Sequence, residues 1–272
     1  MELNTQKIKP FLRWAGGKKW LSKHLTDILP KNGFKNYHEP FMGGGAMFFL
    51  IQPQKQVFLS DLNAELIATY QALKDKPQGI IAELKKFKND VDFYYKIRDK
   101  VYTDSIKNAA KFIYLNQTSF NGIYRVNLKG KYNVPFGYRD KHFIDEDNLM
   151  LVSQALKSAI IFHGDFELSK SNIKKNDFVF LDPPYTVSHN DNGFIKYNQK
   201  LFSLEDQYRL GKLIDSIKSK GAYYLLTNAA HVVIDEIFEK GDKKIELSRA
   251  NLIGGINAKR GHTKEYIFTN IG

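Results

Sequence analysis

The stretch Asp177-Phe-Val-Phe-Leu-Asp-Pro-Pro-Tyr185 decides the fold class of this chain. Its apolar run at 178–181 has the length and composition of a buried strand. Two successive prolines, Pro183 and Pro184, continue neither a sheet ladder nor a helix, so they predict a rigid loop directly after that strand. Ligands of open α/β sheets bind beyond the carboxyl ends of the strands. The stretch therefore predicts an α/β sheet with a binding loop at 182–185, although such a tetrapeptide also fits an ordinary turn.

On both sides of this loop, short β-type runs alternate with stretches of helical periodicity, which is typical of a twisted, mostly parallel sheet covered by helices. The predicted strands are 36–38, 57–60, 160–163, 178–181, 223–227, 245–247 and 265–269. The predicted helices are 18–28, 64–74, 78–87, 107–114, 204–220 and 231–238. No helix separates the last two strands, which predicts an antiparallel edge strand at the end of the chain.

Residues 65–151 lack this alternation and show several helices and one hairpin-like segment. We therefore expect a helical subdomain at 65–151, inserted into a sheet domain made of 1–64 and 152–272. The whole chain of 272 residues has 41 Lys+Arg and 29 Asp+Glu, a formal net charge of +12. Residues 74–141 alone hold 15 basic and 7 acidic side chains. This regional excess favours a polyanionic partner, nucleic acid before an anionic membrane surface.

Composition excludes several classes of site. The chain has no Cys, which excludes disulfides, thiolate metal sites, iron–sulfur clusters and a Cys nucleophile. Its seven His show no metal-ligand spacing, and no Ser/His/Asp arrangement is legible, so we expect no metal and no hydrolase triad. Asp145-Glu-Asp147 is interpreted as a helix cap. Without an apolar leader or a membrane-length apolar run, the expected location is the cytoplasm.

A glycine-rich turn follows the first predicted strand in Tyr37-His-Glu-Pro-Phe-Met-Gly-Gly-Gly-Ala46. Phe48 stands where the dinucleotide fingerprint requires its last Gly, which disfavours a nicotinamide enzyme. Asp61 follows the next strand, where a carboxylate accepts hydrogen bonds from two ribose hydroxyls. Turn and carboxylate together predict a cofactor that contains a nucleoside. The alternative is that Asp61 merely caps the helix that begins near Ala64.

The segment Phe11-Leu-Arg-Trp-Ala-Gly-Gly-Lys-Lys19 resembles only part of a phosphate-binding loop, its Gly-Lys pair. Leu12 stands where that loop needs its first Gly, and Lys19 stands where it needs Ser or Thr. Nucleotide hydrolysis is therefore not expected. Two readings stay open on this segment alone: a contact to a small polar ligand through Trp14 and Lys18, or an ordinary basic turn.

The loop at 182–185 combines an acceptor carboxylate, backbone carbonyls that belong to prolines, and a flat ring. This set suits a planar base whose exocyclic amine is held by acceptors while its ring is stacked. The carboxylate belongs to Asp182 and the flat ring to Tyr185.

Five motifs, in this order, resemble the Dam-like (D12 class) DNA adenine-N6 methyltransferases. They are Arg13-Trp-Ala-Gly-Gly-Lys18, Glu39-Pro-Phe-Met-Gly-Gly-Gly45, Asp61-Leu-Asn63, the stretch from Asn121-Gly-Ile-Tyr-Arg125 to Asn133-Val-Pro-Phe-Gly137, and Asp182-Pro-Pro-Tyr185. The resemblance covers nearly the whole chain. It implies a Rossmann-like domain that uses S-adenosylmethionine without a metal, a helical target-recognition insert, and double-stranded DNA whose adenine is flipped out. A monomer that acts on one strand at a time is the simpler expectation, and a restriction endonuclease for the same site is a candidate partner.

The resemblance also implies roles for individual residues. The methyl-donor site would comprise Trp14, Lys18, Glu39, Pro40, Phe41, Gly43, Gly45, Asp61, Asp165, Phe166 and Asp182. The catalytic loop would comprise Asp182, Pro183, Pro184 and Tyr185. Within the donor site, Asp165 and Phe166 are the pair that would hold the donor's adenine.

The segment 119–137 is rich in basic, aromatic, Asn and Gly residues and is interpreted as an exposed hairpin that meets DNA. Arg125 is the candidate for a bidentate contact to guanine, and Phe120 would fill the gap left by a flipped base. The other predicted DNA contacts are Asn121 and the phosphate-binding residues Lys129, Lys131, Arg139 and Lys141. Phe112 and Tyr114, on a helical pattern, are expected in the core instead.

Three alternatives stay open. Arg249, Lys259 and Arg260 lie in a loop that either grips the DNA strand or is simply solvated. Residues 186–198 read as a mobile loop able to close over the base. The acceptor itself is either adenine in duplex DNA or an amino group of an RNA base, and a binding protein without catalysis is a third reading.

Overall fold

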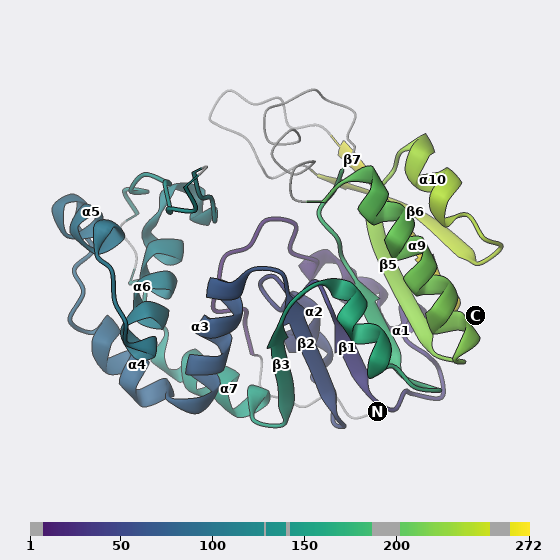
Figure 1. Ribbon diagram of the computed structural model, residues 1–272, viewed down its shortest axis with the longest axis horizontal. Helices are drawn as coiled ribbons and strands as arrows, with labels where there is room; N and C mark the ends of the chain where they lie inside the picture. The colour runs from purple at the N-terminus through teal and green to yellow at the C-terminus, as the bar shows by residue number, and fades with distance from the viewer. Residues whose placement is uncertain (1–7, 128, 140–141, 187–201, 251–261) are drawn as a thin grey trace. The chain divides into compact units, whose positions relative to one another are not determined.

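The computed structural model (Figure 1) describes residues 8–127, 129–139, 142–186, 202–250 and 262–272. Its strands form one seven-stranded sheet in the order β3-β2-β1-β4-β5-β7-β6. The strands are β1 (Tyr37–Glu39), β2 (Val57–Asp61), β3 (Ala159–His163), β4 (Phe178–Leu181), β5 (Tyr223–Ala229), β6 (Lys243–Ala250) and β7 (His262–Thr269). The pairs β2/β3, β1/β4 and β4/β5 are parallel, whereas β7 runs antiparallel to β5 and β6. The predicted mixed α/β class is confirmed.

The chain divides into two compact units. Unit 1 comprises Met1–Lys23 and Met42–Asp165, and unit 2 comprises His24–Phe41 and Phe166–Gly272. The sequence-based division into 1–64 with 152–272 and an insert at 65–151 follows a different criterion, the interruption of strand–helix alternation. That division stays a prediction.

Unit 1 holds β2, β3 and six α-helices, of which α3 to α7 gather beside β3 (Figure 1). The helices are α2 (Ala46–Ile51), α3 (Ala64–Asp75), α4 (Pro77–Leu84), α5 (Val91–Asp99), α6 (Ser105–Thr118) and α7 (Glu146–Leu156). Their starts follow from capping chemistry. Asn63, Asp90, Asp104 and Asp145 each accept a backbone N–H of the first turn of α3, α5, α6 and α7, respectively.

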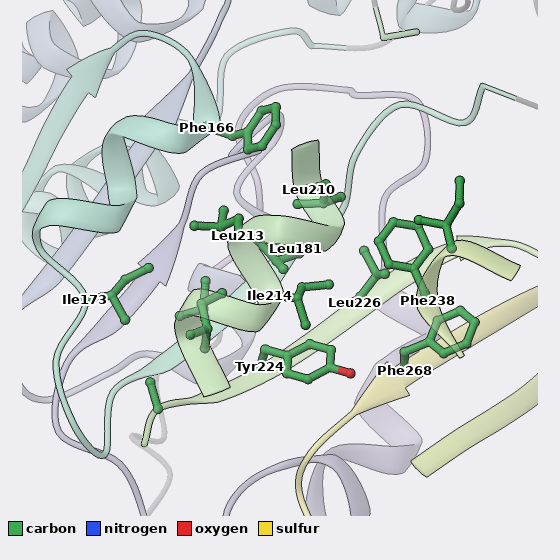
Figure 2. Packing of buried hydrophobic residues seen from close by; sticks show 14 of the residues in the cluster. Phe166, Ile173, Leu181, Leu210, Leu213, Ile214, Tyr224, Leu226, Phe238 and Phe268 are labelled. Carbon is green, nitrogen blue, oxygen red and sulfur yellow. The ribbon is translucent and has the colours of Figure 1, made fainter. Parts of the chain in front are cut away.

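Unit 2 packs α9 (Leu204–Ser219) and α10 (Val232–Phe238) against the strands β4, β5 and β7. Figure 2 shows Leu181 of β4, Leu226 of β5 and Phe268 of β7 in one cluster with Leu210 and Ile214 of α9. All four residues of β4 are buried, as expected of a central parallel strand. This cluster fixes the end of β4, from which the loop at 182–185 departs.

A buried polar pair joins β1 to the start of β4. His38 Nε2 lies 2.9 Å from Asp177 Oδ2, and both side chains are fully buried. Burial raises the pKa of Asp177, but hydrogen bonds from His38 and from the N–H groups of Lys174 and Asn36 outweigh it and leave that pKa below its ordinary value. The group therefore stabilises the fold at neutral pH, and this contribution is lost only as the pH falls through the lowered pKa.

Most predicted elements are present with shifted ends, and some expectations were wrong. The predicted helix 18–28 is instead a 3-10 helix, η1 (Lys19–His24), followed by the single turn α1 (Leu25–Ile28). The last strand is antiparallel as predicted, but it is not at the edge: β7 lies between β5 and β6, and β6 is the edge strand. Asp145 caps α7, as interpreted from the sequence. No helix in the described part of the chain is long and apolar enough to cross a membrane.

The cap of α3 supplies a test of stability. Asn63 Oδ1 accepts the N–H of Leu66 at 3.0 Å, so Asn63→Ala leaves a donor of the first turn without its partner. We expect a loss of about 1 kcal/mol in the free energy of unfolding, measured by urea denaturation. Asn63→Asp keeps an acceptor at the same place and should recover most of that loss. Equal losses in both variants would contradict the capping role.

Candidate active site

The glycine-rich turn and the end of β2 form a candidate site within unit 1. The N–H of Gly43 donates to Asp61 Oδ2 and the N–H of Asn63 donates to Asp61 Oδ1, each at 2.9 Å. Both carboxylate oxygens therefore accept a backbone N–H, and the carboxylate still has acceptor capacity for a ligand. Asn63, not Asp61, caps α3, so the alternative reading of Asp61 as a simple cap is wrong.

The Asp61 carboxyl is electrostatically unusual. Burial raises its pKa above the ordinary value, against the lowering effect of the N–H groups of Gly43, Asn63 and Leu62 and of His163. The N–H groups hold the carboxyl in a fixed orientation, while burial disfavours its charged form. Perturbed groups of this kind are typical of binding sites, and the carboxylate form is the one that accepts from two hydroxyls at once.

Two glycines of the turn have backbone conformations that side chains rarely adopt. Gly43 has φ +47°, and a Cβ atom there would lie 2.7 Å from Cδ1 of Trp14. Gly45 has φ +65°, and a Cβ atom there would lie 2.9 Å from the Phe49 ring. The turn is therefore a close-fitting cradle, with Trp14 against one side of it. Glycine is required here by the close packing of Trp14 and Phe49 on the turn. A nucleoside-containing ligand at this turn stays a prediction.

Lys18 lies in the same unit and is only 2% exposed. Its ammonium donates to the carbonyl of Gly16 at 2.8 Å, which is a contact within the segment 11–18 itself. Asp165 follows β3, whose residue His163 is paired in register with Asp61 of β2. The N–H of Gly164 donates to the Asp61 carbonyl at 3.1 Å. The structure thus gathers Trp14, Gly43, Asp61 and Asp165 near the carboxyl ends of β2 and β3. Their role in a donor site stays a prediction.

The remaining predicted donor residues belong to unit 2. Glu39 and Pro40 are buried at the end of β1, and Tyr37 donates its hydroxyl to Glu39 Oε2 at 2.8 Å. Burial, and then the charge of Glu39, raise the pKa of Tyr37 far above its ordinary value. Phe41 is half-buried and stacks on Phe166 with ring centroids 5.2 Å apart.

Phe166 is more enclosed than its predicted role requires. Its side chain is 4% exposed and belongs to the core of unit 2. Its ring also packs against Phe202 and lies 4.9 Å from the guanidinium carbon of Arg209. In this arrangement Phe166 supports the ring of Phe41, and its contact with a donor's adenine stays a prediction.

The loop after β4 presents a further candidate site, within unit 2. The carboxylate of Asp182 is half-buried, and its Oδ1 accepts the hydroxyl of Thr227 on β5 at 2.7 Å. Pro183 is buried, whereas Pro184 and Tyr185 are half-buried. The loop therefore holds one oriented carboxylate at the carboxyl end of a central strand.

A buried polar network fixes the far end of this loop. Thr186 donates to the carbonyl of Phe202 at 3.0 Å and accepts from Gln207 Nε2 at 2.9 Å. Asn228, next to Thr227 on β5, donates to Gln207 Oε1 at 3.0 Å. A satisfied network of this kind is rigid. It ties the loop to α9 and β5. The predicted closing loop at 186–198 otherwise lies outside the described residues.

Comparison with known proteins now gives the chemistry of this arrangement. The family described as "D12 class N6 adenine-specific DNA methyltransferase" matches residues 14–251. The chain belongs to this family of DNA methyltransferases. It is an enzyme of the mixed α/β methyltransferase class, and the resemblance read from the five motifs is confirmed.

Curated relatives agree with the D12 class assignment over most of their length. The chain is 35% identical to the Type II methyltransferase M1.LlaDCHI of Lactococcus lactis subsp. cremoris, covering 100% of this chain and 99% of the relative. It is 36% identical to the Type II methyltransferase M.MjaIII of Methanocaldococcus jannaschii, covering 96% and 97%. It is 32% identical to a DNA adenine methylase of Haemophilus influenzae, covering 96% and 93%.

Residues 119–137 of this D12 class chain, called the recognition segment after their predicted role, fold back in an antiparallel manner. Isolated bridges join Ser119 to Phe136 and Val126 to Tyr132. The N–H of Asn133 donates to the Arg125 carbonyl at 3.1 Å. The predicted hairpin-like shape is therefore confirmed, although it contains no regular strand among its described residues.

Several predicted DNA contacts are exposed on this segment. Phe120 is 51% exposed, and Asn121, Arg125, Lys129 and Lys131 are exposed as well. The Arg125 guanidinium donates to the side chain and the carbonyl of Asn133, which fixes its direction. Arg139 is half-buried. Phe112 and Tyr114 are buried, as expected of core residues. Lys141, Lys259 and Arg260 lie outside the described residues.

Sequence reasoning missed residues that the structure places at the site. Thr227 is one, since it holds Asp182 from a neighbouring strand 45 positions away in the chain. Tyr124 is another, because it stacks on Trp14 from within the recognition segment. The polar pair Thr227-Asn228 at the end of an apolar strand was the signal for the first. Nothing in the sequence pairs Tyr124 with Trp14. Among the described residues, no group of three or more His, Asp or Glu is placed to hold a metal ion.

Proposed function

We propose that this enzyme transfers a methyl group from S-adenosylmethionine to N6 of adenine at a specific sequence of double-stranded DNA. The observation that carries the proposal is the Asp182 carboxylate, held by Thr227 at the start of a proline-locked loop directly after β4. It stands in a chain of the N6 adenine-specific family. A carboxylate held in this way is suited to accept a hydrogen bond from an amine.

The chemistry needs such an acceptor because the N6 lone pair of adenine is delocalised into the ring. In the proposed reaction Asp182 and the carbonyl of Pro183 accept the two N6 hydrogens and orient the lone pair. The nitrogen forms a bond to the methyl carbon while the carbon–sulfur bond breaks and sulfur keeps its electron pair. N6 then loses one proton, and the proposed acceptor of that proton is the Asp182 carboxylate. Pro184 keeps the loop rigid, and Tyr185 stacks on the flipped base.

The donor site is proposed for the cradle around Gly43 and Gly45. When bound, S-adenosylmethionine supplies an electrophilic methyl group on a sulfonium sulfur. Asp61 accepts hydrogen bonds from its ribose hydroxyls with the lone pairs that Gly43 and Asn63 leave available. The other residues proposed for this site are Trp14, Lys18, Glu39, Pro40, Phe41, Asp165, Phe166 and Asp182.

The recognition segment is proposed to meet the DNA. Arg125, fixed by Asn133, reads a base edge. Phe120, half-exposed, fills the space left by the flipped adenine. Asn121, Lys129, Lys131, Arg139 and Lys141 contact the backbone or neighbouring bases. We propose that the chain acts as a monomer in the cytoplasm. Its similarity to Type II methyltransferases supports a companion endonuclease for the same site.

The alternative acceptor is an amino group of an RNA base, because the loop at 182–185 by itself suits other planar amines. The test is transfer of isotope-labelled methyl from S-adenosylmethionine to mixed-sequence duplex DNA, with total RNA in parallel. Digestion to nucleosides and mass spectrometry then identify the labelled product. We expect the label in N6-methyldeoxyadenosine. Label in an RNA nucleoside, or no transfer to DNA that is rich in potential sites, would overturn the proposal.

A further inference from the structure

Trp14 packs closely against the glycine-rich turn of the proposed donor site. A Cβ atom at Gly43 would lie 2.7 Å from Cδ1 of Trp14, and one at Gly44 would lie 3.0 Å from its Cβ. The indole therefore rests directly on the backbone of this turn. Any change in the turn moves Trp14, and any change in Trp14 moves the turn.

The same indole stacks on the recognition segment. The rings of Trp14 and Tyr124 have centroids 5.4 Å apart at an interplanar angle of 21°. Tyr124 immediately precedes Arg125 and also packs against Phe112 and Tyr132. One aromatic contact thus separates the donor turn from the residue proposed to read a base.

The backbone next to Trp14 is tied to the recognition segment as well. Asn116 on α6 accepts the N–H of Arg13 at 2.7 Å and donates to its carbonyl at 2.8 Å. The side chain of Arg13 lies so close to Gly122 that a Cβ atom there would be 2.6 Å from Cδ of Arg13. Residues 13 and 14 are therefore held between the turn and the recognition segment.

A second connection runs through the hydroxyl of Tyr124. It donates to Glu65 Oε2 at 2.9 Å, in the first turn of α3. Glu65 lies four positions after Asp61, the proposed ribose acceptor, on the same strand-to-helix connection. Tyr124 thus contacts both parts of the donor site that frame the nucleoside: the turn through Trp14, and the end of β2 through Glu65.

We propose that Tyr124 is a positioning residue that couples occupancy of the methyl-donor site to DNA binding by the recognition segment. The inference rests on the proposed function. A donor in the cradle fixes the turn and Trp14, and Trp14 fixes Tyr124 and the adjoining Arg125. Because the stack and the Arg13 contacts connect the two sites, a ligand that favours one arrangement of the turn favours one arrangement of the segment. Each ligand therefore strengthens the binding of the other by the same factor.

The test measures that factor directly. S-adenosylhomocysteine serves as the donor-site probe, and a fluorescent duplex containing the mapped methylation site serves as the DNA. The dissociation constant of each is measured with and without a saturating amount of the other. For the wild-type enzyme we expect a coupling factor of about 10, the same in both directions, within the range usual for coupled sites.

Variants then separate coupling from packing. Tyr124→Leu, which removes the stack and the hydroxyl, should bring the factor close to 1. Tyr124→Phe, which keeps the ring, should keep the factor within about twofold of wild type, since the stack is the main connection. Tyr95→Leu on α5 is the matched control in the same unit and should leave the factor unchanged. Urea denaturation shows whether each variant folds.

Two results would overturn the inference. One is a Tyr124→Leu enzyme that binds DNA more weakly by the same factor with and without S-adenosylhomocysteine, because that is the behaviour of a merely structural residue. The other is a wild-type enzyme that methylates DNA with a coupling factor of 1, which leaves the proposed function standing. A wild-type enzyme that transfers no methyl group to DNA overturns the proposed function, and this inference with it.

Discussion

Asp182→Asn should lower the rate of methyl transfer about 10²–10³-fold, the usual cost of removing one preorganised polar group that acts in the transition state. The amide oxygen can still accept the hydroxyl of Thr227, so the loop keeps its anchor. The amide nitrogen, however, is a donor, and it would face the hydrogens of the N6 amine instead of accepting one. The measurement is a single-turnover rate with saturating donor and duplex.

Binding measurements and a control make this prediction specific to chemistry. The affinities of Asp182→Asn for S-adenosylhomocysteine and for duplex DNA should stay within a few-fold of wild type. Asp215→Asn, which removes an exposed carboxylate paired with Lys240, should leave the rate unchanged. A single-turnover rate of Asp182→Asn close to that of wild type would remove Asp182 from the catalytic machinery.

Thr227→Val gives an intermediate step in the same series. It keeps the Asp182 carboxylate and the volume of the side chain but removes the hydroxyl that orients Oδ1. Loss of orientation without loss of the acceptor should lower the single-turnover rate roughly tenfold, or about 1.4 kcal/mol. This ordering, with Asp182→Asn well below Thr227→Val, is what an acceptor held by a positioning residue requires.

The strand that precedes Asp182 could be predicted to the residue because its ends are chemically sharp. The run at 178–181 is uniformly apolar. It is bounded by Asp177 on one side and by Asp182-Pro183 on the other, and neither extends the apolar pattern. The order of the last strands could not be read with the same certainty. Both β6 and β7 are strand-like, and their place depends on which one packs on β5.

A signal for that order is nevertheless present. The four residues from Tyr266 to Thr269 in β7 are almost entirely apolar, and Ile267 and Phe268 are buried in the structure. The strand β6 instead alternates charged and apolar residues, as in Lys243-Lys-Ile-Glu-Leu. Charged residues are typical of edge strands. The apolar strand β7 therefore lies inside the sheet, between β5 and β6, and the charged strand β6 forms its edge.

The candidate site divides in the same way between what motifs reveal and what only packing reveals. Asp61, Gly43 and Asp182 follow strands, where sequence alone predicts ligand contacts. The partners that hold or couple them come from distant parts of the chain. Trp14 and Tyr124 are 110 positions apart, and no local periodicity or spacing can join two such aromatic residues. The helix α5 was likewise not singled out, because its aromatic and β-branched residues also fit a strand.

Asp61→Asn should weaken donor binding about 100-fold at pH 8. The carboxylate accepts backbone N–H groups and still offers two acceptor oxygens to the ribose hydroxyls, whereas the amide offers only one acceptor atom. Hydrogen bonds to charged groups contribute about 1.5–3 kcal/mol each, so losing even one of them weakens donor binding strongly. The measurement is calorimetric titration with S-adenosylhomocysteine, and Asp75→Asn at the far end of α3 is the matched control.

The pH dependence of wild-type binding tests the same carboxyl. Burial raises the pKa of Asp61, so its charge is lost at a higher pH than that of an exposed Asp, which titrates near pH 4 (about 3.9). Donor affinity should therefore fall as the pH drops through that raised pKa, and Asp61→Asn should show no such fall. Unfolding does not explain the loss, because the sign for stability is opposite. A carboxyl whose pKa is higher in the folded state favours folding as it becomes protonated, and opposes folding only as the pH rises. Wild-type affinity that stays flat down to pH 4 would mean that Asp61 carries no charge-dependent contact to the donor.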